Sequence, residues 1–81
     1  MLHIGKDAMV PLKDVILILD YKEAMTNDDT HNFLKKLGDT AHNIYLDEVG
    51  IKSVVVARFL EKYFIYYSPI SSATLYKRSK I

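Results

Sequence analysis

The chain has 81 residues, of which 49% are hydrophobic and 26% are charged, and it contains no cysteine. This length fits one domain over residues 1–81 and leaves no room for a second independent core. The lack of cysteine excludes disulfides and thiolate metal sites. A single core of this size rarely contributes more than about 3–5 kcal/mol, so we expect the domain to gain buried surface by assembling with copies of itself.

The charges are nearly balanced, with eleven Lys and Arg against ten Asp and Glu and a formal net charge of +1. Such a balance does not by itself indicate nucleic-acid binding. The longest aliphatic run, residues 15–19, is far shorter than the roughly 20 residues that cross a bilayer. The first residues also lack a charged leader followed by an apolar stretch. We therefore expect a soluble, cytoplasmic protein with no membrane partner.

The N-terminal part of the chain predicts extended structure. Residues 2–4 form a short strand, residues 9–10 resume it, and Pro11 fixes a bend. Residues 15–19 form the strongest strand. Because this strand is apolar at every position, we expect both of its faces to be covered.

A helix is predicted over residues 28–37. Thr26 or Asn27 can cap its start, and Gly38 supplies its stop. The apolar face would carry Thr30, Phe33, Leu34 and Leu37, and the solvated face His31, Asn32, Lys35 and Lys36.

Three further strands and a short helix are predicted after it. The strands cover residues 43–46, 53–57 and 63–67, and turns between them make two hairpins in series, a meander. Ser71 or Ser72 can cap a last helix over residues 73–77. The predicted fold class is therefore α+β, a small and mostly antiparallel β-sheet with one central helix and a short C-terminal helix.

The apolar strands suggest an interface between copies. One ten-residue helix cannot cover both faces of a five-stranded sheet, so we expect a neighbouring copy to cover the strands over residues 15–19 and 63–67. Tyrosine is enriched in the middle of interfaces, and six tyrosines fit that use. The alternative is that they line a thin core within the chain. The predicted oligomer-interface residues are Ile16, Ile18, Tyr63, Ile65 and Tyr67.

No motif predicts catalysis. Residues 50–53, Gly-Ile-Lys-Ser, lack the first glycine, the Gly-Lys step and the following helix of a phosphate-binding loop. Asp28 and His31 lie one helical turn apart but have no third metal ligand. We therefore expect no enzymatic activity, no cofactor, no metal site and no small-molecule substrate.

Basic residues gather near the C-terminus, where Lys77, Arg78 and Lys80 fall within the last five positions. One copy would bind phosphates weakly, but an oligomer repeats the patch and multiplies weak contacts. Lys13, Lys52 and Arg58 are further candidates for DNA contact.

Three segments together resemble a known family. Residues 2–5 (LHIG), 10–16 (VPLKDVI) and above all 67–75 (YSPISSATL) resemble the RemA/RemB group of small bacterial regulators of extracellular matrix genes, most closely its RemB-like branch. The resemblance implies a cytoplasmic, DNA-associated regulator of biofilm matrix expression. It also implies a LytTR-like subunit that assembles into a ring of seven or eight copies, whose rim contacts double-stranded DNA.

The chain departs from the RemA-type pattern at the DNA-contacting arginines. Asp14 stands about where the family has an arginine before the long strand, beside Lys13. The arginine-rich turn is replaced by residues 47–52, where only Lys52 matches. Lysine cannot form the bidentate contact of a guanidinium with phosphate. The resemblance therefore implies weaker or relocated DNA contact.

Two functions follow from these expectations. The first is a ring-forming transcriptional regulator that holds the DNA backbone through Lys13 and Lys52 by family matching, and through Arg58, Lys77 and Arg78 by charge. The second is an oligomeric protein–protein interaction module that acts in the same regulation without binding DNA, through its tyrosines or the solvated helix face. A third possibility, a small enzyme, requires a pocket that the sequence does not define.

Overall fold

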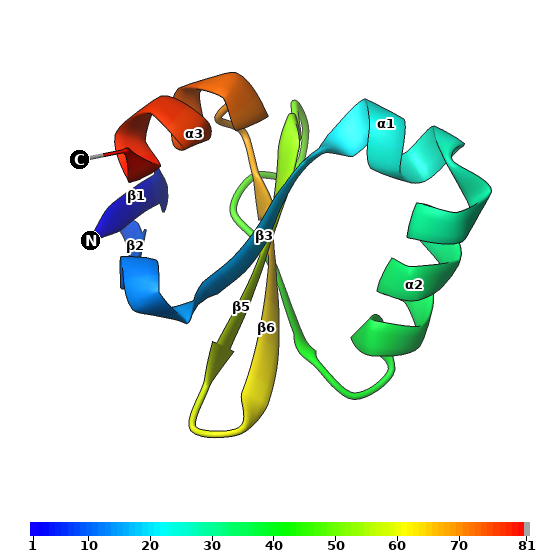
Figure 1. The fold of residues 1–81 in the computed structure, drawn as a ribbon. Helices are drawn as coiled ribbons and strands as arrows, with labels where there is room; N and C mark the ends of the chain where they lie inside the picture. The colour runs from blue at the N-terminus through cyan, green and yellow to red at the C-terminus, as the bar shows by residue number, and fades with distance from the viewer. Residues whose placement is uncertain (81) are drawn as a thin grey trace.

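The computed structural model describes residues 1–80. Its elements, in chain order, are β1 (Leu2–Gly5), β2 (Ala8–Val10), the short 3₁₀ helix η1 (Leu12–Asp14), β3 (Val15–Asp20), α1 (Tyr21–Thr26), α2 (Asp28–Gly38), β4 (His42–Tyr45), β5 (Ser53–Phe59), β6 (Lys62–Ser68) and α3 (Ser72–Ser79). A four-stranded sheet lies between two layers (Figure 1). The β1–β2 hairpin and α3 cover one face, and α1 and α2 cover the other, which confirms the α+β class.

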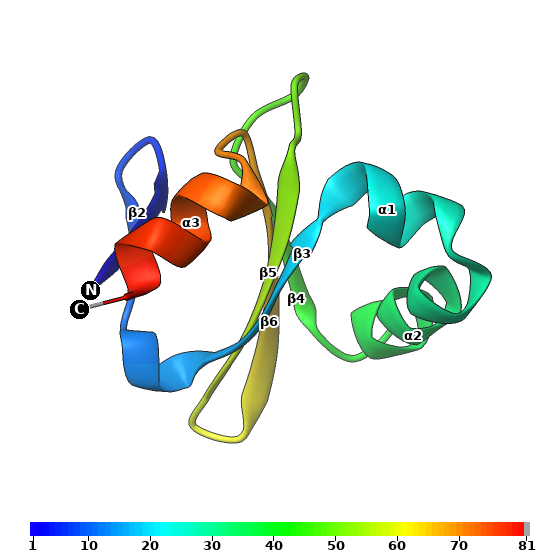
Figure 2. The same ribbon diagram turned by 45° about the horizontal axis from the view of Figure 1, so that its top comes forward.

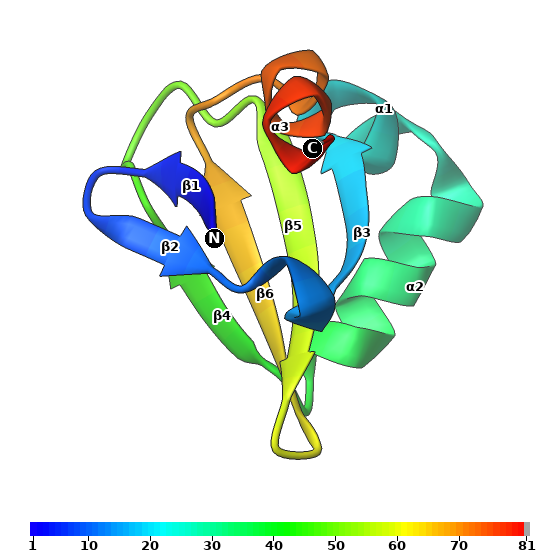
Figure 3. The same cartoon turned by 60° about the vertical axis from the view of Figure 1, so that its left-hand side comes forward.

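The strand order in the sheet is β3-β5-β6-β4 (Figure 3). β5 pairs antiparallel with both β3 and β6, whereas β4 runs parallel to β6. The predicted meander is therefore wrong, and so is the single five-stranded sheet, because β1 and β2 form a separate two-stranded sheet. β3 and β6 already occupy the two sides of β5, so β4 cannot pair with β5 and lies along the free side of β6.

The strand that is buried on both faces is β5, not the segment over residues 15–19. Val54, Val55 and Val56 are at most 1% exposed, because β5 is central and both layers pack on it. β3 lies at the edge of the sheet, where Ile16 is 49% and Leu17 is 37% exposed. The uninterrupted aliphatic run over residues 15–19 therefore forms an edge strand, and the prediction that both of its faces are covered was wrong.

A second helix of the chain itself helps to cover the sheet, where a neighbouring copy was expected. α1, which the sequence analysis did not predict, joins α2 in one layer on one face of the sheet (Figure 2). Asp20 caps α1, and its carboxylate accepts a hydrogen bond from the Glu23 amide at 3.0 Å. Asn27, one of the two predicted caps, begins α2 by accepting from the Thr30 amide at 3.0 Å.

Each face of the sheet has its own core. The first core lies under β1, β2 and α3 and contains Leu2, Ile4, Val10, Ile18, Leu46, Val55, Ala57 and Leu75. The second core lies under α1 and α2 and contains Ala24, Leu34, Val54, Val56 and Ile65. Three partly buried tyrosines, Tyr21, Tyr63 and Tyr67, pack against the second core.

The two ends of the chain meet on the first face. The buried Ser68 hydroxyl donates to the Ile4 carbonyl and accepts from the Ile70 amide at 3.0 Å. Gly5 has φ +136°, and a Cβ there would lie 3.0 Å from the Pro69 ring, so both conformation and space favour glycine. Ser71, one of the two predicted caps, begins α3.

The hairpin between β5 and β6 projects beyond the rest of the domain (Figure 3). Its two turn residues, Leu60 and Glu61, have φ +52° and +65°, the combination that type I′ turns require and that Asn-Gly usually supplies. Leu60 is 76% exposed at the tip. The turn thus holds two side chains in a conformation that ordinarily favours glycine.

Candidate nucleic-acid interface

The five predicted DNA-contacting residues lie in three places. Lys52 precedes β5 at one end of the sheet, and Lys13 and Arg58 lie at the other end, where β3 starts and β5 finishes. Lys77 and Arg78 lie in the last turn of α3. Six residue steps along β5 at about 3.3 Å each separate its two ends by about 20 Å. Lys13 and Lys52, the pair matched to the family, therefore lie far apart in one copy.

Lys52 is exposed, and its backbone joins two elements. Its amide donates to the Ser68 carbonyl at 2.8 Å, and its carbonyl accepts from the Tyr21 amide at 3.0 Å. The position of residue 52 is thus fixed by β6 and α1, while its side chain is exposed at the surface.

Arg58 lies over an aromatic ring. Its guanidinium carbon is 5.6 Å from the centre of the Tyr63 ring, the cross-strand neighbour of Arg58 on β6. Strand alternation places Arg58 on the same face as Val54 and Val56, toward α1 and α2. A cation held over an aromatic face is attracted by the ring quadrupole, which orients the guanidinium.

Arg78 connects the C-terminal helix to the N-terminal hairpin. Its Nη1 atom donates to the His3 carbonyl at 3.1 Å and lies 3.3 Å from His3 Nδ1. His3 Nε2 lies 2.5 Å from the Lys6 carbonyl. A guanidinium can only donate and a carbonyl can only accept, so the imidazole satisfies both as the neutral tautomer with its proton on Nε2.

The contact between Arg78 and His3 brings the two chain ends together, and we call the basic residues at and next to it in sequence or turn the terminal basic cluster: His3, Lys6, Lys77 and Arg78. Lys6, Lys77 and Arg78 are exposed, and the strand β1 lies close to the helix α3 (Figures 1 and 2). Asp7, beside Lys6 in the turn, is an acidic neighbour of the cluster. The sequence analysis missed His3 and Lys6, because 75 positions separate His3 from Arg78 and no local pattern links them.

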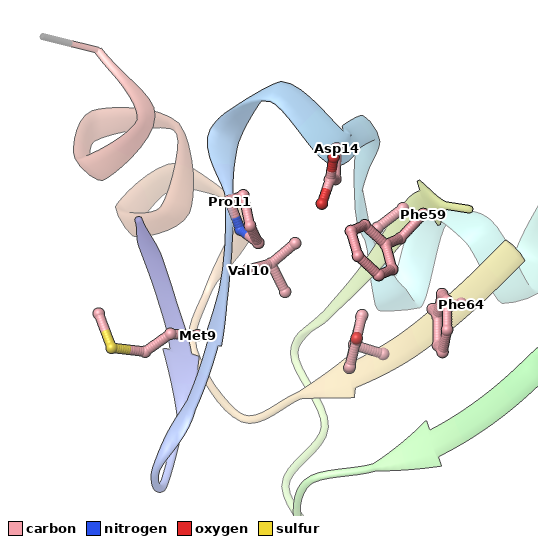
Figure 4. A pocket seen from close by; sticks show the side chains of 8 residues that line it. Met9, Val10, Pro11, Asp14, Phe59 and Phe64 are labelled. Atoms are coloured by element: carbon pink, nitrogen blue, oxygen red, sulfur yellow. The ribbon is translucent and has the colours of Figure 1, made fainter. Parts of the chain in front are cut away.

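Asp14 faces an apolar hollow instead of taking part in a basic surface (Figure 4). The hollow has a volume of about 190 Å³, and Asp14 is the one charged residue in its lining, beside Val10, Phe59 and Tyr66. Burial, and then the negative charge of Asp14, raise the pKa of Tyr66. A carboxylate here repels phosphate, so this position does not replace the family's arginine.

The predicted interface residues divide between core and surface. Ile18 is 7% exposed and Ile65 is fully buried, so both belong to the cores of the chain itself and offer no surface to a neighbour. Tyr63 and Tyr67 are partly buried against the second core. Ile16, at 49% exposed on the edge strand β3, has the most free surface of the five.

Three tyrosines stack beside the β4 edge of the sheet. The Tyr45 and Tyr67 rings are parallel within 6° with centres 4.2 Å apart, and Tyr21 meets Tyr67 edge-on at 6.4 Å. Burial, followed by the neighbouring Tyr45 and Tyr21, raises the pKa of Tyr67 to about 12. The sequence analysis missed Tyr45, because the stack depends on the parallel pairing of β4 with β6.

Comparison with known proteins supplies one close relative. The chain is 38% identical over 79 residues to extracellular matrix regulatory protein B of Bacillus subtilis, a match that covers 98% of this chain and 89% of the relative. This finding confirms the resemblance to the RemB-like branch. No family model matches the chain, and no solved structure matches it. Within residues 1–80, none of the helices has the length and apolar character needed to cross a membrane.

Proposed function

Because the chain belongs to the family of extracellular matrix regulatory protein B, we propose that it is an oligomeric, DNA-binding regulator of extracellular matrix genes that acts in the cytoplasm. The observation that carries the DNA-binding part is the terminal basic cluster, where Arg78 links both ends of the chain. The cluster is a relocated phosphate-binding surface, which takes over from the arginines that residues 14 and 47–52 lack.

The chemistry of the cluster suits the DNA backbone. Arg78 uses Nη1 for its contacts with His3, and its other N–H groups can bind a phosphate. Lys6, in the turn after β1, and Lys77, next to Arg78 on α3, add exposed charges. Such contacts position a duplex without reading its bases, so binding is similar on all sequences and weakens with salt.

Assembly of several copies would raise the affinity for DNA, because it repeats these weak contacts. The edge strand β3 exposes Ile16 and Leu17, and within residues 1–80 no strand pairs with its outer side. The Tyr76 hydroxyl donates to the Ile18 carbonyl at 2.5 Å, so α3 closes the edge at one point and leaves the Ile16 region open. We propose that copies join there, in a ring such as the family resemblance implies, and that each copy presents one basic cluster on the rim.

The test combines DNA binding with molar mass. The full chain is titrated into a labelled duplex of about 30 base pairs at low and physiological salt, followed by fluorescence anisotropy, with light scattering in the same buffers. Lys77→Glu should weaken binding equally on unrelated sequences and flatten the dependence of log affinity on log salt. Lys36→Glu, the same change on the exposed side of α2, is the control and should bind like the unmodified chain.

Two outcomes would contradict the proposal. If Lys77→Glu and Lys36→Glu weaken binding equally, the terminal basic cluster is not the contact surface. If a large oligomer forms and binds no duplex at either salt, the second function, a protein–protein interaction module, is correct. The acidic Asp14 in the family's arginine position is the observation that favours this alternative. Ile16→Lys should lower the molar mass in either case, because it places a charge on the open edge of β3.

A further inference from the structure

A second hollow, with a different lining, lies between α2 and the β4–β6 side of the sheet. Its volume is about 250 Å³, and it is lined by the tyrosine stack on one side and by α2 on the other. The residues that matter for binding are Tyr45, Tyr67, His31, Lys35 and Asn43. They combine aromatic rings, cationic or polar donors and an amide around one concave space, which is the usual composition of a small-ligand site.

The tyrosine stack provides a fixed aromatic platform. Tyr67 covers one face of the Tyr45 ring at 4.2 Å, yet Tyr45 is 64% exposed, so its other face is open. Tyr67 is itself held by the edge of Tyr21, and the parallel ladder pairs residue 45 with residue 67. A planar ring can therefore stack on Tyr45 without any rearrangement, and stacking of a base on an aromatic side chain is a main source of affinity for nucleotides.

The opposite wall of the hollow supplies the groups that bind an anion. His31 and Lys35 are one turn apart on α2, so their side chains lie on the same side of the helix and line the same hollow. Lys35 carries a full positive charge, and His31 provides a ring N–H donor. Both groups can bind a phosphate.

Asn43 adds a polar group of fixed orientation. Its Nδ2 atom donates to the Gly38 carbonyl at 3.0 Å and to the Ala41 carbonyl at 3.4 Å. Both amide hydrogens are thus used within the chain, and Oδ1 is left to accept a hydrogen bond. A Cβ on Gly38 would lie 3.4 Å from this oxygen, so glycine keeps the space around it open. The exocyclic amino group of a base is a suitable donor.

We propose that this hollow binds a nucleotide, with the base stacked on the open face of Tyr45, the phosphate at Lys35 and His31, and the exocyclic amino group at Asn43 Oδ1. The hollow at Asp14 also has aromatic rings, but its lining contains no cationic or amide side chain and its one charge is negative. The same chemistry is presented by a free mononucleotide and by an unpaired nucleotide of a single strand. The site is separate from the terminal basic cluster and does not depend on duplex binding.

The experiment measures binding of two probes to the full chain by calorimetry: adenosine monophosphate and a short single-stranded oligoadenylate. Tyr45→Ala should weaken binding by about ten-fold or more, and Tyr45→Phe should restore it, because phenylalanine keeps the stacking face. Lys35→Ala should weaken binding by several-fold. Phe33→Ala and Lys36→Ala are the controls: both residues are exposed on α2, outside the lining of the hollow, and these changes should have no effect.

The outcomes distinguish a free mononucleotide from a nucleotide of a single strand, and some of them would overturn the proposal. Binding of the mononucleotide assigns a free ligand, and binding of the oligonucleotide alone assigns a single strand. If neither probe binds at millimolar concentration, or if Tyr45→Ala binds as well as Tyr45→Phe, the proposal is wrong. If Tyr45→Ala instead lowers the molar mass of an assembly that binds neither probe, the tyrosine face is a contact between copies. Lys77→Glu should leave nucleotide binding unchanged, so this test does not depend on the duplex proposal.

Discussion

The two faces of the sheet are built differently. The first face is covered by segments from both ends of the chain; its core has eight buried aliphatic residues, and the partly buried Tyr66 lies beside the hollow at Asp14. The second face is covered by α1 and α2, has five buried core residues, and is completed by partly buried tyrosines beside an open hollow. Figure 2 shows the two layers on opposite sides of the strands.

This difference separates stability from ligand binding. Both cores are built from densely packed aliphatic side chains, and the first core, with eight such residues against five, suits the role of holding the fold together. The hollow of the second face is lined by tyrosine rings and by polar side chains, whereas the hollow of the first face is mostly apolar, so the second face is better suited to ligand binding. We therefore expect substitutions on the first face to affect mainly the free energy of unfolding, and exposed substitutions on the second face to affect mainly binding.

The largest expected effect compares two buried leucines. Leu75 on α3 is fully buried in the first core, and Leu34 on α2 is 3% exposed beside the hollow of the second face. Buried Leu→Ala changes cost about 2–5 kcal/mol, and the cost grows with the cavity that is left. Leu75→Ala should lie in the upper half of this range and Leu34→Ala near its lower end, because a space that joins an existing hollow adds little new cavity.

Urea unfolding followed by circular dichroism at one fixed protein concentration measures this difference, since assembly makes stability depend on concentration. The two variants should share the slope of the unmodified chain, so that a change in midpoint reports stability alone. An equal or larger loss for Leu34→Ala would show that the second face is as closely packed as the first and would weaken the proposed division of roles.

A smaller effect is expected at the hydrogen bond that fastens the N-terminal hairpin to the sheet. Ser68→Ala removes the hydroxyl that donates to the Ile4 carbonyl and accepts from the Ile70 amide, and leaves both groups without this partner. A buried polar group without a partner costs about 1–3 kcal/mol. Hydrogen exchange of the β1–β2 amides should accelerate while that of α2 stays unchanged. Ser72→Ala, at the partly exposed start of α3, is the control and should change stability by less than about 0.5 kcal/mol.

Local signals predicted the elements better than their arrangement. The caps at Asn27 and Ser71, the order of strands and helices and the α+β class followed from short-range patterns. The position of β4 did not, because nothing within residues 42–52 indicates that β3 already occupies one side of β5. The helix α1 was missed because its six residues are too short for a clear apolar period, and its cap is the last residue of a strand.

The candidate sites, too, could be predicted from local sequence only in part. Lys77 and Arg78 could be found by charge alone, whereas His3 joins them through a contact that spans 75 positions. Ile18 and Ile65 were proposed as interface residues because their strands are apolar, and only the position of each strand in the sheet shows that they are core residues. The hollow at Tyr45 requires both the parallel β4–β6 pair and the packing of α2, so no sequence window could reveal it.

The smallest expected effect concerns two consecutive tyrosines on opposite faces. Burial and then Asp14 raise the pKa of Tyr66, whereas burial and then Tyr45 and Tyr21 raise the pKa of Tyr67 to about 12. The folded chain keeps these protons to higher pH than the unfolded chain, whose tyrosines titrate near pH 10. The contribution of Tyr67 to the free energy of unfolding is therefore fully present below about pH 10 and is lost as the pH rises through about 12, and the contribution of Tyr66 has the same sign.

Asp14→Asn separates the two environments. It removes the negative charge beside Tyr66, so the pKa of Tyr66 should fall while that of Tyr67 stays near 12. Tyr45→Phe should have the opposite selectivity and lower the pKa of Tyr67 alone. Tyrosinate absorbance, with residue-resolved NMR of the ring signals, follows each ionisation. If Asp14→Asn lowered both pKa values by the same amount, the charge would act through the sheet on both faces, and the faces could not be treated as separate electrostatic environments.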